Sequence, residues 1–188
     1  MRPLLLVCLL AALAGPSAAD TDPLYQPRGP GAVFPTVEAA AVDGLAHAHR
    51  VERRSQNSRL SRGGVIRAVP GGFTYDALVA ASEEHPDELT LVLAQDVVAH
   101  FHTYPRQNPA IDRTNEAHSA EDRAIVDELD RLGRPSYVLT PSLRIVGYYG
   151  RDARAAVPRA VRAGRVPSEV MVATLRSGAG AALLAASN

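Results

Sequence analysis

Apolar and polar residues follow a helical period in one early segment of the chain. Between Thr36 and Arg54, apolar side chains such as Val37, Leu45 and Ala48 recur every three or four positions, and charged or polar side chains fill the remaining face. Residues three or four apart lie on the same face of an α-helix. The pattern predicts an amphipathic helix that begins near Thr36 and ends near Arg54.

Two pairs of short apolar runs have the pattern of β-hairpins. Segments 65–69 and 73–75 flank a Pro-Gly-Gly turn, and segments 136–140 and 143–149 flank Pro-Ser. Apolar, β-branched and aromatic residues on both sides of a short glycine or proline turn are typical of paired strands. We therefore expect one hairpin before the middle of the chain and one after it.

The middle of the chain predicts further strands and a second helix. A short helical turn is expected at 76–82 and strands at 89–94 and 97–103. A polar loop should follow the second of these strands and lead to a helix over 120–132. The order of helix, strands, helix and strands predicts an α+β (α/β-like) fold, with one mostly antiparallel sheet flanked by helices.

The first residues have the pattern of a secretory signal peptide. One arginine precedes an apolar run from Leu4 to Ala14, and the small residues Ser17 and Ala19 stand where a signal peptidase cleaves before Asp20. The run is about half of the ~20 residues that a membrane span needs. We expect a secreted or periplasmic protein with no membrane span after cleavage.

Composition narrows the classes of partner and of metal ligand. The chain has 20 basic and 20 acidic residues, so its charge does not favour nucleic acid. Every basic residue is arginine and alanine is abundant, which favours a GC-rich bacterial gene. The only cysteine, Cys8, lies in the expected signal peptide. Any metal is therefore expected to be held by His, Asp, Glu or Tyr.

These patterns divide the chain into four expected parts. Residues 1–19 are the signal peptide, 20–35 a flexible lead-in rich in proline and glycine, and 36–150 the folded domain. Residues 151–188 form an Ala/Arg-rich extension with short helical patterns that prolines interrupt.

Candidate chemistry is concentrated where the strand 97–103 ends. His100, His102 and Tyr104 occupy every second position, so on an extended strand their side chains lie on one face. Ser119 is expected to cap the next helix and Asp122 to lie in its first turn. Two imidazoles and a carboxylate can together form a three-ligand metal site.

Each of these residues also has a simpler explanation. The two histidines can be a polar row at a strand end, hydrogen-bonded to the backbone or to water. Tyr104 can be a packed aromatic residue with a wet hydroxyl. Ser119 and Asp122 are explained by helix capping alone. His118 and Glu116, in the preceding loop, are expected to be exposed.

Several segments in this order resemble the JAB/JAMM (MPN-type) metallopeptidase-like superfamily. They are Gly-Gly-Val-Ile at 63–66, Phe-His-Thr-Tyr-Pro at 101–105, the stretch 115–122 and Pro-Ser-Tyr-Val-Leu-Thr-Pro at 135–141. More narrowly, they resemble a bacterial branch of unknown function that occurs in secreted and toxin-associated proteins. The resemblance covers roughly 37–149 and implies a single JAMM-like domain.

The resemblance also implies roles for individual residues. In that superfamily a His-x-His pair and an Asp bind zinc, a Ser helps to hold the oxyanion, and a Glu is the general base. Ser119 and Asp122 match the Ser-x-x-Asp element. The histidine pair matches either His100 and His102, or His102 with Tyr104 in place of the second histidine.

The chain departs from the family at the general base. Where the family has Glu before the Gly-Gly strand, this chain has Leu-Ser61-Arg62, and the replacements available in the sequence are Glu52, Glu83 and Glu84. The hypothesis is a JAMM-like domain with a degenerate metal site that binds a peptide or protein partner with little or no hydrolysis. The alternative is a zinc-dependent peptidase or isopeptidase.

Overall fold

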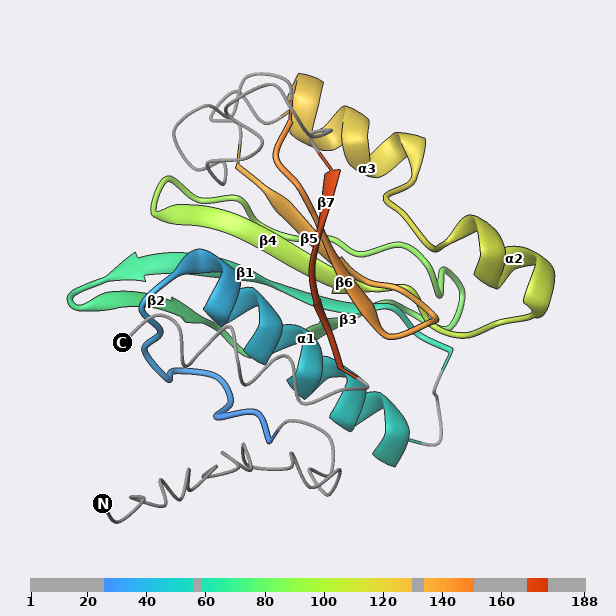
Figure 1. Ribbon diagram of the computed structural model, residues 1–188, viewed down its shortest axis with the longest axis horizontal. Helices are drawn as coiled ribbons and strands as arrows, with labels where there is room; N and C mark the ends of the chain where they lie inside the picture. Colours follow the sequence, from blue (N-terminus) through green and yellow to red (C-terminus); the bar gives the residue numbers. More distant parts are fainter. Residues whose placement is uncertain (1–25, 56–58, 130–133, 151–168, 176–188) are drawn as a thin grey trace, which may run out of the picture.

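The computed structural model describes residues 26–55, 59–129, 134–150 and 169–175, and within them it forms one seven-stranded sheet with flanking helices (Figure 1). The strand order is β2-β1-β4-β5-β6-β7, with β3 also paired to β1. Among the described strands, only β4 and β5 run parallel. The expected α+β class with a mostly antiparallel sheet is confirmed. No helix in these ranges is both long and apolar enough to cross a membrane.

The elements follow one another along the chain with these bounds: α1 Val37–Arg54, β1 Arg62–Val69, β2 Gly72–Tyr75, β3 Val79–Ala80, β4 Val97–Thr103, α2 Pro109–Thr114, α3 Ala120–Ala124, a π-helical turn η1 Ile125–Leu129, β5 Ser136–Leu139, β6 Arg144–Tyr148 and β7 Glu169–Thr174.

Helix α1 forms as its sequence predicts and covers one face of the sheet. Thr36 caps it by accepting a hydrogen bond from the Ala39 N–H at 3.1 Å. Its apolar face, including Leu45, is buried against β1 and β4. Gly44 allows a close approach, because a Cβ there would lie 2.6 Å from the Phe101 ring. Residues 99 and 101 of β4 therefore face α1, and residues 100 and 102 face away from it.

Both expected hairpins are present. Strands β1 and β2 pair with Arg67 opposite Thr74, and Gly71 in the turn between them has φ +87°, which favours glycine. Strands β5 and β6 pair with Val138 opposite Val146. These hairpins form as predicted because each is local in sequence and has turn residues suited to its connection.

Two expectations between the hairpins are wrong. Segment 89–94 is not a strand. The strand that follows it, β4, has no free edge for it, because β4 is paired with β1 and with β5. Segment 76–82 contains the strand β3 in place of a helical turn, and β3 pairs with β1 through Val79 opposite Gly63.

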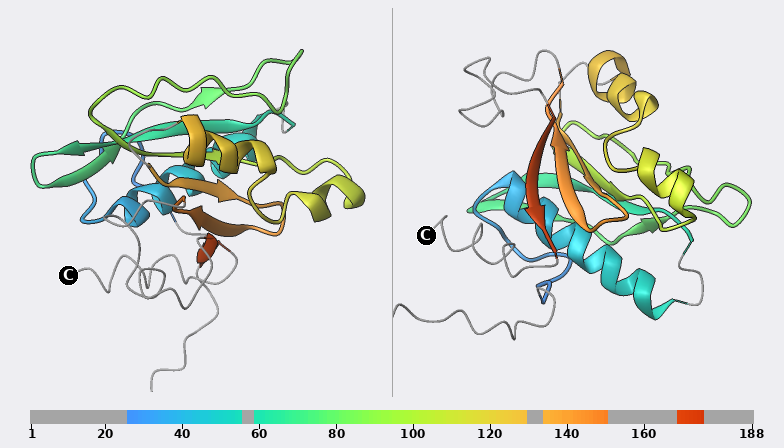
Figure 2. Two further views of the ribbon diagram at one scale, coloured as in Figure 1. Left: turned by 90° about the horizontal axis from the view of Figure 1, so that it is seen from above. Right: turned by 45° about the vertical axis from the view of Figure 1, so that its right-hand side comes forward.

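The second half of the chain differs from expectation at three elements. The loop after β4 contains α2, which Asn108 caps and Pro109 begins. The helix expected over 120–132 is α-helical only to Ala124 and continues as η1, and residues 130–133 lie outside the described ranges. Within the expected extension, β7 joins the sheet beside β6 (Figure 2).

The end of the expected lead-in is attached to the domain. The fully buried carboxylate of Asp43 accepts hydrogen bonds from the backbone N–H groups of Arg28 at 2.7 Å and Gly29 at 3.0 Å, and from the Tyr75 hydroxyl at 2.6 Å. Phe34 also forms a β-bridge with Phe73.

Candidate functional site

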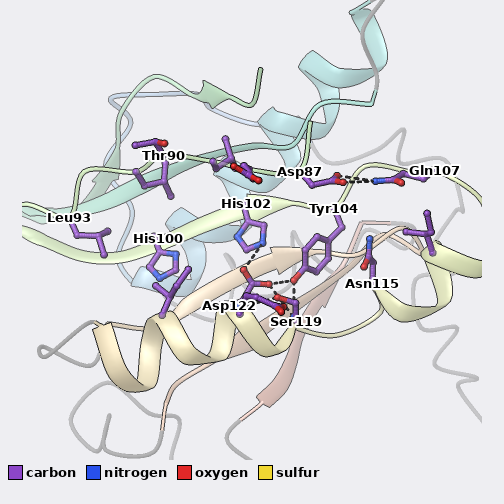
Figure 3. A pocket seen from close by; sticks show the side chains of 16 residues that line it. Asp87, Thr90, Leu93, His100, His102, Tyr104, Gln107, Asn115, Ser119 and Asp122 are labelled. Atoms are coloured by element: carbon purple, nitrogen blue, oxygen red, sulfur yellow. Dashed lines mark hydrogen bonds and ion pairs between the residues drawn. The ribbon is translucent and has the colours of Figure 1, made fainter. Parts of the chain in front are cut away.

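Strand β4 presents its two histidines on the face that α1 leaves uncovered. The side chains of His100 and His102 point to the same side of the strand, and Tyr104 follows one residue beyond the strand end (Figure 3). The rings of His102 and Tyr104 meet edge to face with their centres 5.1 Å apart. The expected one-sided arrangement of these three residues is present.

The N-terminus of α3 brings Ser119 and Asp122 to this face. Their side chains form a capping box: Ser119 Oγ accepts from the Asp122 N–H at 3.0 Å, and Asp122 Oδ2 accepts from the Ser119 N–H at 3.1 Å. The same Oδ2 accepts a hydrogen bond from the Tyr104 hydroxyl, while Oδ1 lies 3.5 Å from His102 Nε2. The expected approach of Asp122 to His102 is confirmed.

The contacts around the Asp122 carboxylate stabilise its negative charge. Burial alone opposes ionisation, but the contact with His102 and the hydrogen bonds from Tyr104 and Ser119 outweigh it and hold the pKa of the Asp122 carboxyl far below its usual range. Burial and the negative charge of Asp122 both raise the pKa of Tyr104. Tyr104 is therefore a neutral hydroxyl donor beside a carboxylate.

His100 differs from its neighbour because its buried nitrogen has no partner. The residue is 5% exposed, and its Nε2 makes no hydrogen bond within the described part of the chain. Burial first, and the proximity of His102 second, lower the pKa of His100 from 6.5 to about 3. His100 is thus neutral at physiological pH.

These residues line a cavity of about 690 Å³. Residues between 87 and 93 supply one wall, including part of segment 89–94, which was expected to form a strand, and residues of α2 and α3 supply the other. The lining residues are Asp87, Glu88, Leu89, Thr90, Leu91, Leu93, His100, His102, Tyr104, Gln107, Ile111, Asn115, Ser119, Glu121, Asp122 and Ile125.

The expected zinc ligands are only partly brought together. His102 and Asp122 are adjacent, but in the described ranges no three His, Cys, Asp or Glu side chains converge as a metal site requires. Tyr104, in the position of a third ligand, keeps its proton and donates a hydrogen bond to Asp122. As arranged, the donor set does not fit a three-ligand zinc ion.

The position expected for the general base holds no acid. Ser61 is 1% exposed, and its backbone N–H and C=O pair with Pro86 and Ala81. None of Glu52, Glu83 and Glu84 is among the residues that line the cavity. The carboxylates that do line it, apart from Asp122, are those of Asp87, Glu88 and Glu121, which the sequence pattern did not single out.

His118 is buried, so the expectation that it is exposed is wrong. It is 3% exposed, its Nδ1 lies 2.8 Å from Glu169 Oε1, and its Nε2 lies 3.2 Å from the Ser136 carbonyl oxygen. Glu116 is half-buried, and it accepts hydrogen bonds from Ser142 and Arg144. Both residues hold the loop that leads to Ser119, and their partners are too distant in sequence to be inferred from the local pattern.

Comparisons of the chain with protein-family models, with curated proteins and with solved structures found no match.

Proposed function

We propose that this chain is a secreted JAMM-like domain that binds a peptide segment of a partner in the cavity beside β4 and does not hydrolyse it. The observation that carries the proposal is the engagement of Asp122. Its Oδ2 accepts from both Tyr104 and Ser119, and its Oδ1 faces His102. A carboxylate satisfied in this way is stable without a metal ion.

The surroundings of the site support binding more than catalysis. Peptide hydrolysis through an activated water needs a general base, and a serine hydroxyl such as that of Ser61 does not accept a proton at neutral pH. A cavity of about 690 Å³ with leucine, isoleucine, histidine and carboxylate side chains is suited to hold a ligand of several residues. JAMM-like ancestry accounts for why these residue types occur in this order.

One observation favours the alternative, a zinc-dependent peptidase. His102 Nε2 and Asp122 Oδ1 are 3.5 Å apart. Two ligands of one tetrahedral zinc ion, each at about 2.0–2.1 Å from it, are separated by about 3.3 Å. His102 and Asp122 would then supply two of the ligands, with His100 or Tyr104 as the third and Ser119 near the oxyanion.

One experiment on the mature protein separates the two functions. Zinc content, binding of a mixed-sequence peptide pool and release of cleavage products are measured for the wild type, His102→Ala and Ser61→Glu. We expect the wild type to bind peptides with and without a chelator and to release no product. Turnover by the wild type that is lost on chelation and in His102→Ala would establish the peptidase instead. Turnover only in Ser61→Glu would indicate a scaffold that lacks just its base.

A further inference from the structure

The charged side chains that line the cavity, histidine aside, are all acidic. Four carboxylates line it, those of Asp87, Glu88, Glu121 and Asp122, and neither Arg nor Lys is among the lining residues. The chain as a whole has equal numbers of acidic and basic residues, so this excess is local. Asp87, Glu88 and Glu121 are exposed, and Asp122 is more buried. The potential along the cavity where these carboxylates lie therefore favours a cation.

The end of the cavity around His100 has a different character. Leu93 lies toward this end beside His100 (Figure 3). The Nε2 of His100 is buried and unpartnered in the described part of the chain. An unpaired buried nitrogen costs free energy that a hydrogen-bonding ligand recovers. Neutral imidazole presents either a donor or an acceptor at Nε2, and a peptide group can pair with either.

The two ends lie along one strand. Figure 3 shows Leu93 and His100 toward one end, His102 and Asp122 in the middle, and Asp87 with Gln107 toward the other. From His100 to Tyr104 the chain advances about 13 Å, which is the length of about four extended residues. Behind the apolar end, Arg134 donates to the Leu93 carbonyl oxygen at 3.3 Å, which disfavours a ligand cation there.

We infer that the cavity recognises an extended basic peptide, with an apolar side chain beside His100 and an Arg or Lys side chain at the carboxylates. This inference rests on the proposed peptide-binding function and adds the class of ligand. A backbone group of the peptide pairs with His100 Nε2. The basic side chain, two residues further along the peptide, lies among Asp87, Glu121 and Asp122.

The test compares three fluorescein-labelled pentapeptides by fluorescence polarisation on the mature protein. They are Gly-Leu-Thr-Arg-Gly, the same peptide with citrulline in place of arginine, and the same peptide with glutamate there. Citrulline keeps the shape of arginine and removes its charge. We expect the arginine peptide to bind at least about fivefold more tightly than the citrulline peptide at low salt, with the glutamate peptide weakest. The preference should shrink as salt is added, because exposed charges are screened.

Two sets of variants assign the effect to the two ends. Asp87→Asn with Glu121→Gln should remove most of the preference for arginine. Both side chains are exposed, so the double variant should stay folded. His100→Phe should weaken all three peptides by a similar factor, with thermal unfolding as the check on its fold. Equal binding of the three peptides would overturn the charge inference and leave peptide binding intact. Tightest binding of the glutamate peptide would overturn it too, and failure to bind any peptide would contradict both proposals.

Discussion

Tyr104 stands where a third zinc ligand would be needed beside His102 and Asp122. Its hydroxyl donates to Asp122 and accepts from the Ser119 N–H at 3.0 Å, so it links strand and helix directly. A histidine at position 104 would lie on the same face as His102, beside the same carboxylate. Three ligands of the kind that zinc prefers would then be adjacent.

We therefore predict that Tyr104→His creates a zinc site. Isothermal titration should give at least about tenfold tighter zinc binding than in the wild type, which corresponds to about 1.4 kcal/mol. Tyr104→Phe is the matched control, because it loses the hydroxyl and gains no ligand. Adding His102→Ala to Tyr104→His should remove the gain. Equal zinc affinity of the folded His and Phe variants would contradict the assignment of this position.

The buried His100 makes stability depend on pH. Its pKa is about 3 in the folded protein and 6.5 when solvated, so between these values the unfolded chain binds more protons. The free energy of unfolding should accordingly fall as the pH is lowered from about 7 toward 4. Above about pH 7, His100 is neutral in both states and no longer makes stability depend on pH. Urea titrations across that range should show a shallower fall in His100→Gln, which does not titrate. An identical slope in both proteins would contradict a buried neutral His100.

At the scale of elements, the Glu169 carboxylate connects β7 to His118 and Arg123, which lie on either side of the start of α3. Glu169 accepts from the His118 backbone N–H at 2.7 Å, lies 2.8 Å from His118 Nδ1, and accepts from Arg123 Nη2 at 2.9 Å. Burial opposes its charge, but the contacts with His118 and Arg123 lower its pKa below the usual value. Strand β7 is thereby connected to the loop before α3 and to α3 itself.

Loss of this connection should loosen both elements. Glu169→Ala is expected to lower the free energy of unfolding by about 2–4 kcal/mol, because it leaves the buried His118 without its acceptor. Hydrogen exchange should become faster in β7 and around residues 118–120. Arg123→Gln is the milder comparison, since the Arg123 side chain is 43% exposed and its loss leaves His118 paired. Equal effects of the two substitutions would indicate that the contact with His118 contributes little.

The sequence predicts the elements whose signals are local. Helix α1, the two hairpins, β4 and the capping box at Ser119 each depend on residues within one segment, and all of them form. The alternation at His100 and His102 predicts their common face for the same reason. In the candidate site, the meeting of Asp122 with His102 is the part that the sequence order suggested and the fold brings about.

What the sequence does not predict depends on competition between distant segments. Segment 89–94 has the composition of a strand, but it pairs with no described strand and four of its residues line the cavity, because β1 and β5 occupy the edges of β4. Strand β7 forms through pairing with β6, and nothing near it in sequence indicates that partner. His118 can be buried because Glu169, 51 positions away, supplies a hydrogen-bond partner that offsets the cost of burying its imidazole. The absence of a partner for His100 is likewise a property of the packed fold.

At the scale of the whole molecule, the chain connection explains where the site lies. Strands β4 and β5 are the one parallel pair among the described strands, and a parallel pair needs a crossover connection. That crossover carries α2 and α3, so the end of β4 meets the N-terminus of α3. Tyr104 from the strand and Asp122 from the helix can then share a hydrogen bond.

Cleavage of the expected signal peptide can be measured through the single cysteine of the chain. Cys8 lies within the expected signal peptide, so cleavage before Asp20 removes the only thiol. We predict that the exported, denatured protein contains no titratable thiol and that N-terminal sequencing begins at Asp20 or within a few residues of it. Ala19→Tyr, which places a bulky residue where cleavage requires a small one, should retain one thiol per chain. One thiol per chain in the exported wild type would show that the leader stays attached, and the mature protein would then begin at Met1.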